Sequence, residues 1–145
     1  MMRLFFIDPD QARYADELEL RFQVLRAPLG QTRETVRFPF ERESLHLVAV
    51  DETDALVGCV LFHLESDTEG RLFQMAVATA QQRSGLGRQL VARLEEEVWS
   101  RGVARITLHA RATVVRFYEQ LGYATFGAPF TEVGIAHRMM EKRRG

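Results

Sequence analysis

The sequence has one cysteine and no excess of basic charge, and each shortage excludes a class of protein. Cys59 cannot form a disulfide within the chain, which excludes a disulfide-stapled secreted fold and favours a reducing compartment. The formal net charge is −1, from 19 basic and 20 acidic residues. This balance leaves no electrostatic basis for a nucleic-acid-binding surface or a polybasic membrane anchor.

Long hydrophobic runs are also lacking. The apolar run at residues 4–7 stops at Asp8-Pro9, so it is too short for a signal peptide or a membrane span. With 145 residues, of which 46% are hydrophobic, the chain is large enough to bury a core without disulfides or metal. We therefore expect a single domain over residues 1–145 and a cytoplasmic location.

The apolar pattern predicts a mixed α/β fold with a mostly antiparallel sheet. Strands are expected at residues 3–7, 45–50, 55–65, 71–77, 104–110, 123–130 and 132–140. Helices are expected from Asp8-Pro9 to about residue 28, briefly from Thr32, and at residues 86–101 and 114–121. In the first helix, the apolar face consists of Ala15, Leu18, Phe22 and Leu25; in the long helix it consists of Leu86, Leu90, Leu94 and Val98. The acidic run at residues 95–97 is expected on the solvent face.

The stretch QQRSGLGRQL, residues 81–90, places flexible backbone and positive charge where the long helix begins. A helix N-terminus has unpaired N–H groups and partial positive charge, and Gly85 and Gly87 let an anion approach those groups. Arg83 and Arg88 add charge, so a phosphate or pyrophosphate fits; an ordinary turn with surface arginines is the alternative. The loop has neither the third glycine of a dinucleotide fingerprint nor the Gly-Lys-Ser/Thr of a P-loop.

A second motif, FYEQLGY at residues 117–123, follows the loop motif QRSGLG at residues 82–87. Together the two motifs resemble the GNAT superfamily of acyl-CoA-dependent N-acyltransferases, and the expected order of elements matches over nearly the whole chain. The segments at residues 24–30 and 130–140 resemble a small bacterial branch of single-domain members. The resemblance implies an N-acetyltransferase with acetyl-CoA as the acyl donor and no metal.

The resemblance also implies where coenzyme A binds. The pyrophosphate would lie against Arg83, Ser84, Gly85, Leu86, Gly87 and Arg88. Pantetheine would pair with the backbone at Met75, Ala76 and Val77, where the family's strand splays from its neighbour. Many relatives have an asparagine after the strand at residues 104–110; none occurs in RATVVRFY, residues 111–118, so contacts on that side depart from the pattern.

Two residues are candidates for the chemistry. Tyr118 matches the tyrosine that many family members use as a general acid toward the CoA sulfur; the alternative is that it only packs its helix. His109 lies where some relatives carry a glutamate that acts through water, so it is a candidate base. An exposed or hydrogen-bonded histidine without a role in the chemistry is the alternative.

The acceptor is expected to be a primary amine on a small molecule, peptide or protein. Candidate substrate contacts are Arg26, Arg33, Gln74, Glu132 and His137, with surface arginines and a core histidine as the alternatives. Neither His46 nor His63 is assigned a role, and Cys59 is expected to be buried and inert. A homodimer and a monomer both stay open, as does a non-catalytic acyl-CoA-binding sensor; nucleic-acid and membrane partners are not expected.

Overall fold

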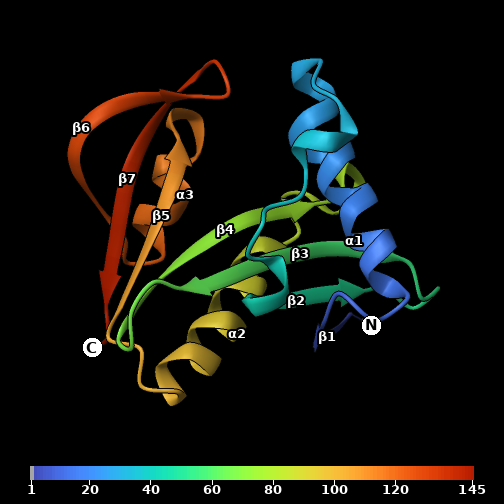
Figure 1. The fold of residues 1–145 in the computed structure, drawn as a ribbon, viewed down its shortest axis with the longest axis horizontal. Coiled ribbons are helices and arrows are strands. Elements are labelled where there is room, and N and C mark those ends of the chain that lie inside the picture. Colours follow the sequence, from blue (N-terminus) through green and yellow to red (C-terminus); the bar gives the residue numbers. More distant parts are fainter. Residues whose placement is uncertain (1) are drawn as a thin grey trace.

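A seven-stranded sheet forms the centre of the protein, in a computed structural model that describes residues 2–145 (Figure 1). Its strand order is β1-β2-β3-β4-β5-β7-β6, and every neighbouring pair is antiparallel except the parallel pair β4–β5. The strands are β1 (Arg3–Ile7), β2 (Leu45–Val50), β3 (Leu56–Leu64), β4 (Glu69–Val77), β5 (Arg105–Arg111), β6 (Ala124–Glu132) and β7 (Ile135–Arg143). The predicted mixed, mostly antiparallel fold is confirmed.

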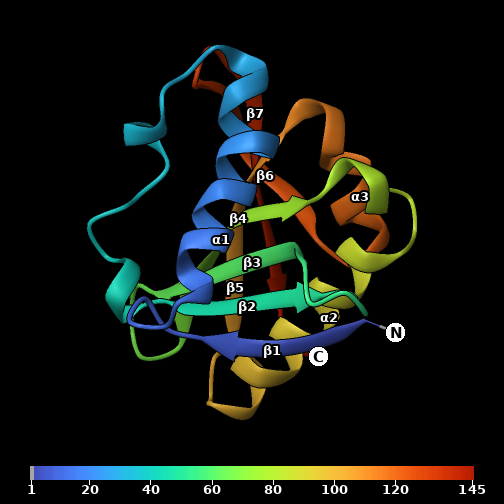
Figure 2. The same ribbon diagram turned by 90° about the vertical axis from the view of Figure 1, so that its right-hand side faces the viewer.

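Helices cover both faces of this sheet (Figure 2). The α-helices are α1 (Arg13–Arg21), α2 (Leu86–Ser100) and α3 (Val115–Gln120). The shorter turns are the π-helix η1 (Phe22–Arg26) and the 3-10 helices η2 (Ala27–Leu29), η3 (Arg33–Thr35), η4 (Glu41–Glu43), η5 (Thr79–Gln81) and η6 (Ala112–Val114). Among the described helices, none is long and apolar enough to cross a membrane.

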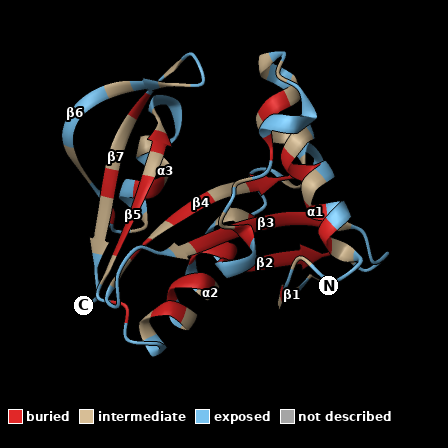
Figure 3. Cartoon of the chain, viewed as in Figure 1, coloured by how far each residue is buried: buried red, intermediate tan, exposed pale blue. Residues whose placement is uncertain are grey.

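The central strands are buried on both sides, which explains their continuous apolar runs (Figure 3). On one side, α2 packs its predicted face against β2, β3 and β4, and Leu86, Leu90, Leu94 and Val98 are each at most 2% exposed. On the other side, α1 covers Cys59 and Leu61 of β3. As predicted, Cys59 is buried, and burial raises the pKa of its thiol far above the usual range.

The first helix differs from the prediction at its start. The side chain of Asp8 accepts a hydrogen bond from the Asp10 N–H at 2.8 Å, so a turn at residues 8–12 delays α1 until Arg13. Its buried face is also different. Ala15 is exposed and Leu18 only half-buried, whereas Glu17 and Arg21 are fully buried.

The buried face continues into the π-helix. Tyr14, Glu17, Arg21 and Arg26 are buried at spacings of three, four and five residues. The last spacing matches the wider turn of η1, which shifts the helical phase and faces Arg26 inward. The expected amphipathic face was therefore wrong, because the polar groups of Tyr14, Glu17 and Arg21 find partners inside the protein and occupy the buried face in place of the apolar row.

Glu95 is a second correction. It was expected in solvent, but it is 9% exposed and accepts hydrogen bonds from the Tyr123 hydroxyl at 2.8 Å and Lys142 Nζ at 2.9 Å. These donors come from the segment after α3 and from β7. The glutamate thus ties α2 to the C-terminal half of the sheet.

Candidate active site

The parallel strands β4 and β5 separate soon after they meet. They pair only from Glu69↔Arg105 to Arg71↔Thr107, and beyond Arg71 no described strand lies against this side of β4. Figure 1 shows the two strands diverging as the arms of a V. The divergence leaves the backbone edge of β4 open at residues 72–77, including the predicted segment Met75–Val77.

A β-bulge lies within the open part of β4. Cys59 pairs with Ala76 and Leu61 with Phe73, so β4 has one more residue than β3 between these pairs. Gln74 adopts a left-handed backbone (φ 51°) there, and its carbonyl oxygen accepts a hydrogen bond from the Cys59 thiol at 3.4 Å. The bulge breaks the side-chain alternation and lets the neighbours Gln74 and Met75 both line one cavity.

The N-terminus of α2 follows the open end of β4. The helix begins after Gly85, whose φ of 89° is left-handed, and its first helical hydrogen bond runs from the Gln89 N–H to the Gly85 carbonyl. Between Gly85 and Arg88, no backbone N–H donates to any described group. Four donors and the positive helix end therefore point out of the loop together.

Hydrogen bonds hold this loop in place. Gln82 Nε2 donates to the Val77 carbonyl at 3.0 Å, and Ser84 Oγ donates to the Gln81 carbonyl at 2.5 Å. Arg83 and Arg88 are exposed and have no acidic partner within the described residues. Leu86 is buried in the core, so only its backbone is available to a ligand.

Gly87 connects the loop to the rest of the site. A Cβ there would lie 3.3 Å from Phe117 Cζ and 3.4 Å from Met75 Cε, so α2, α3 and β4 meet at this glycine. Tyr118, next in α3, is 6% exposed, with its ring 5.0 Å from that of Phe117 and 5.7 Å from that of Tyr123. Its hydroxyl makes no hydrogen bond to a described residue, and burial raises its pKa well above the usual range.

His109 and His137 are joined by one carboxylate. His109 Nδ1 lies 2.8 Å from Glu132 Oε1, and His137 Nε2 lies 3.7 Å from Glu132 Oε2. Because a carboxylate only accepts, the shorter contact of His109 needs a proton on Nδ1, which in the neutral ring leaves Nε2 free to accept one. Arg71 Nη2 lies 3.2 Å from the same Nδ1, and since a guanidinium only donates, it makes no hydrogen bond to this nitrogen in that form. Burial would raise the pKa of Glu132, but the hydrogen bond and charge of His109, with the charges of Arg71 and His137, lower it instead. Glu132 is therefore a stable anion.

A cavity of about 330 Å³ lies beside this carboxylate. It is bounded by the segment after α1, by the open part of β4, by the end of β5 and by the β6–β7 turn. Its lining consists of Leu25, Arg26, Thr35, Phe38, Arg71, Gln74, Met75, Arg111, Glu132, Val133 and His137. His109 does not itself line the cavity, but it contacts Glu132, which does. The open strand edge, the unpaired helix end and this cavity thus form one continuous candidate site around Met75.

Comparison with known proteins agrees with this geometry. Residues 22–144 match the family model described as an acetyltransferase (GNAT) domain. The chain belongs to the GNAT family. An uncharacterized acetyltransferase of Streptococcus pyogenes is 30% identical over 94 residues, which cover 65% of this chain and 64% of that protein. The matches to two Bacillus subtilis proteins span about half of those proteins, 50% and 49%.

Solved GNAT structures confirm the fold over almost the full chain. Escherichia coli ElaA superposes with a TM-score of 0.87 at 16% identity, covering 99% of this chain and 100% of that one. An aminoglycoside 6'-N-acetyltransferase complexed with coenzyme A superposes with a TM-score of 0.79 at 22% identity, covering 97% and 96%.

Most of the residues singled out in this GNAT chain lie together. The segments 75–77 and 83–88 meet at Gly87, and Arg26, Gln74, Glu132 and His137 line the same cavity. Arg33 does not join them, because it is exposed on the surface, paired with Glu19 and lying over the ring of Phe22. His137 is buried, and its Nδ1 lies 2.9 Å from the Ile135 carbonyl oxygen, which can accept a hydrogen bond from it as in a satisfied core histidine. His137 also borders the cavity.

Sequence reasoning missed two arginines of the cavity. Arg71 lies three residues before Gln74, a spacing that puts strand residues on opposite faces unless a bulge intervenes. No sequence signal for that bulge was available. Arg111 could have been found, since it shares the face of β5 with His109 by simple alternation.

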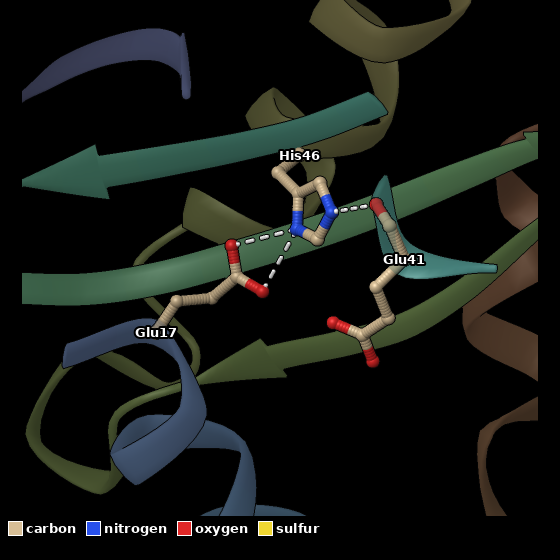
Figure 4. Close-up of side chains that lie close together, drawn as sticks. All are labelled: Glu17, Glu41 and His46. Carbon is tan, nitrogen blue, oxygen red and sulfur yellow. Dashed lines mark hydrogen bonds and ion pairs between the residues drawn. The ribbon is translucent and has the colours of Figure 1, made fainter. Parts of the chain in front are cut away.

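A separate charged cluster is fully buried beneath α1 (Figure 4). Glu17, Glu41 and His46 bring carboxylate and ring-nitrogen atoms within 4.8 Å of one another, a spacing at which a metal ion could be held. Arg21 already pairs with Glu17 at 2.7 Å and Glu41 at 2.5 Å. Tyr14 donates to Glu41 at 2.6 Å.

His46 completes this network. Its Nδ1 lies 3.0 Å from both Glu17 oxygens, and its Nε2 lies 2.8 Å from the Glu41 carbonyl oxygen. Both ring nitrogens face acceptors, so the ring carries two protons. Burial opposes that charge, but Glu17 outweighs it and the pKa of His46 is raised. Arg21 and His46 thus supply two cations to two carboxylates, which fits a structural charge network better than a metal centre.

Proposed function

We propose that this protein is an N-acetyltransferase that moves an acetyl group from acetyl-CoA to a primary amine by direct attack. The observation that carries the proposal is the meeting of the open β4 edge with the unpaired N-terminus of α2 at Gly87. The open edge of β4 suits an extended amide chain such as pantetheine, and the N-terminus of α2 suits a pyrophosphate. The structurally similar aminoglycoside 6'-N-acetyltransferase has been solved in complex with coenzyme A.

The donor would be held by residues at both features. The N–H groups of residues 85–88 and the side chains of Arg83, Ser84 and Arg88 would bind the pyrophosphate. The backbone of Met75, Ala76 and Val77 would pair with pantetheine and place the thioester beside the cavity. A backbone N–H near Met75 would stabilise the oxyanion; removing one such donor elsewhere costs about 2.7–4 kcal/mol.

The reaction then needs two proton transfers. The amine nitrogen attacks the thioester carbonyl carbon, the carbon–sulfur bond breaks, and the thiolate leaves with the electron pair. Tyr118 would hydrogen-bond to this sulfur, since its hydroxyl has no partner among the described residues. The amine proton would pass through water to His109, which Glu132 holds in the tautomer with a free Nε2.

Titration calorimetry with acetyl-CoA tests the binding half of the proposal. Gly87→Glu is a poor probe because its Cβ would press on Phe117 and Met75. Arg83→Glu is better, since Arg83 is exposed and unpaired among the described residues; it should weaken acetyl-CoA at least tenfold by like-charge repulsion, about 1.4 kcal/mol. Arg144→Glu, an equal charge change in the exposed C-terminal tail, is the matched control. Equal affinity in both variants would remove the loop from the site.

A non-catalytic acyl-CoA sensor is the second candidate. It is favoured by the packing of Tyr118 between Phe117 and Tyr123, which explains this residue without chemistry. Tight acetyl-CoA binding without acetyl transfer to any amine would decide for it.

A further inference from the structure

The cavity beside Met75 contains more positive charge than the protein neutralises. Three guanidinium groups line it, those of Arg26, Arg71 and Arg111, against a single carboxylate, Glu132. None of the three makes an ion pair within the described residues. The single carboxylate is already engaged by His109 and His137.

Arg26 shows the imbalance most clearly. Its side chain is 7% exposed, and within the described residues it donates only to backbone carbonyls, those of Thr35 and Leu25, each at 3.3 Å. Burial, and next the charge of Arg111, lower its pKa. A buried cation without an ion-pair partner is unfavourable, so the surroundings of Arg26 favour an anionic ligand.

The other two arginines likewise form no ion pair within the described residues, and the charges of Glu132 and Glu65 act on Arg71 only from a longer distance. Arg111 Nη2 donates to the Leu25 carbonyl at 3.1 Å, next to the contacts of Arg26. Arg71 Nη2 lies 3.2 Å from the protonated nitrogen of His109, and its Nε is buried without a partner. All three cations thus converge on one volume from η1, β4 and β5.

Polar groups of the opposite kind line the same cavity. The side-chain oxygen of Gln74 is buried and accepts no hydrogen bond from a described group. Glu132 adds an anion from the end of β6. An amine placed at the open edge of β4 would find acceptors in these two groups, while the arginines remained for a negatively charged group a few bonds away.

From this arrangement we infer that the acceptor is a primary amine carrying a carboxylate, of the amino-acid type. Arg26, Arg71 and Arg111 bind the carboxylate, and Gln74 and Glu132 orient the amine toward the thioester. The inference rests on the proposed acetyl transfer and names its acceptor class. A carboxylate on the acyl group instead of the acceptor would satisfy the same arginines, and the experiment separates the two sources.

The experiment measures acetyl transfer from acetyl-CoA to matched acceptors: amino acids, their carboxamides and the corresponding amines without the carboxyl group. We expect kcat/KM to be about 10- to 100-fold higher for the acids, the range for charge-assisted hydrogen bonds. A parallel series with succinyl-CoA and the uncharged acceptors tests the acyl source. Preference for succinyl-CoA together with no preference for acidic acceptors would overturn the inference.

Arg111→Gln tests the arginines directly, because this half-buried side chain has only one hydrogen bond, to a backbone carbonyl. The ratio of kcat/KM for each acid to kcat/KM for its carboxamide should fall about 10- to 100-fold, mainly because KM for the acid rises. Arg33→Gln, on the neighbouring loop but outside the cavity, should leave this ratio unchanged. Equal losses for acids and carboxamides in Arg111→Gln would overturn the assignment.

Two negative results are distinguishable. Transfer to uncharged amines as fast as to acids would overturn the acceptor class and leave the proposed acetyltransferase intact. Transfer to no member of either set would overturn the proposed function and this inference with it.

Discussion

Replacing Tyr118 with phenylalanine separates catalysis from packing. The variant keeps the ring and its contacts with Phe117 and Tyr123, at centroid distances of 5.0 and 5.7 Å. The hydroxyl that it removes makes no hydrogen bond to any described residue. No donor or acceptor of the protein is therefore left unpaired, and we expect Tm to change by less than about 4 °C, corresponding to roughly 1 kcal/mol.

The effect on turnover should be much larger. Burial raises the pKa of Tyr118, so the hydroxyl stays protonated across the range in which the enzyme would be assayed. A positioned general acid contributes about 10²–10⁴-fold, which corresponds to about 2.7–5.5 kcal/mol in the barrier. Because the bond to sulfur strengthens only as thiolate forms, kcat should fall by this factor while acetyl-CoA affinity is retained.

The assay follows release of the free thiol at saturating acetyl-CoA, with single-turnover measurements to show that chemistry limits the rate. Calorimetry and thermal melting of the same preparations provide the controls. A decrease in kcat of less than about threefold in single turnover would refute the role, since general-acid catalysis contributes far more. Tyr118 would then be a core residue, and water would protonate the leaving thiolate.

Two further outcomes concern histidines. His109→Gln should lower kcat/KM and remove the acid limb of its pH profile, because glutamine cannot take up the amine proton; an unchanged acid limb would exclude His109 as the base. Because the pKa of His46 is raised in the folded protein, protonated His46 stabilises the fold fully below about pH 6.5. This stabilisation is lost as the pH rises through the raised pKa, and the free energy of unfolding then falls by at most about 1.4 kcal/mol per pH unit. The free energy of unfolding in urea, measured from pH 6 to 9, should show this decline in the wild type and not in His46→Gln. The same dependence on pH in both proteins would contradict the buried His46–Glu17 pair.

The sequence pattern predicted those elements whose buried face consists of regularly spaced apolar residues within one segment. In α2, four apolar residues at a spacing of four form one helical face, and all four are in the core. The glycine loop before it could likewise be interpreted locally, because unpaired N–H groups occur at every helix start and Gly85 supplies the left-handed turn. Gly122, with φ 97°, ends α3 for the same local reason.

The face of α1 could not be predicted this way. Glu17 and Arg21 are buried only because Glu41 and His46 arrive from η4 and β2 with complementary charges. Such residues are normally placed in solvent, since burying an unpaired charge is strongly unfavourable. The partners are 20 or more residues away along the chain, so no local pattern contains them.

The arginine-lined cavity depended on tertiary structure in the same way. Arg26 faces it through a π-turn, Gln74 through a bulge, and Arg71 and Arg111 from two strands that part after three residue pairs. Each of these is a departure from regular geometry that is stabilised by contacts with other elements. The glycine loop was therefore predictable because its geometry resides in a few consecutive backbone groups, whereas the arginine-lined cavity exists only where four separate segments converge.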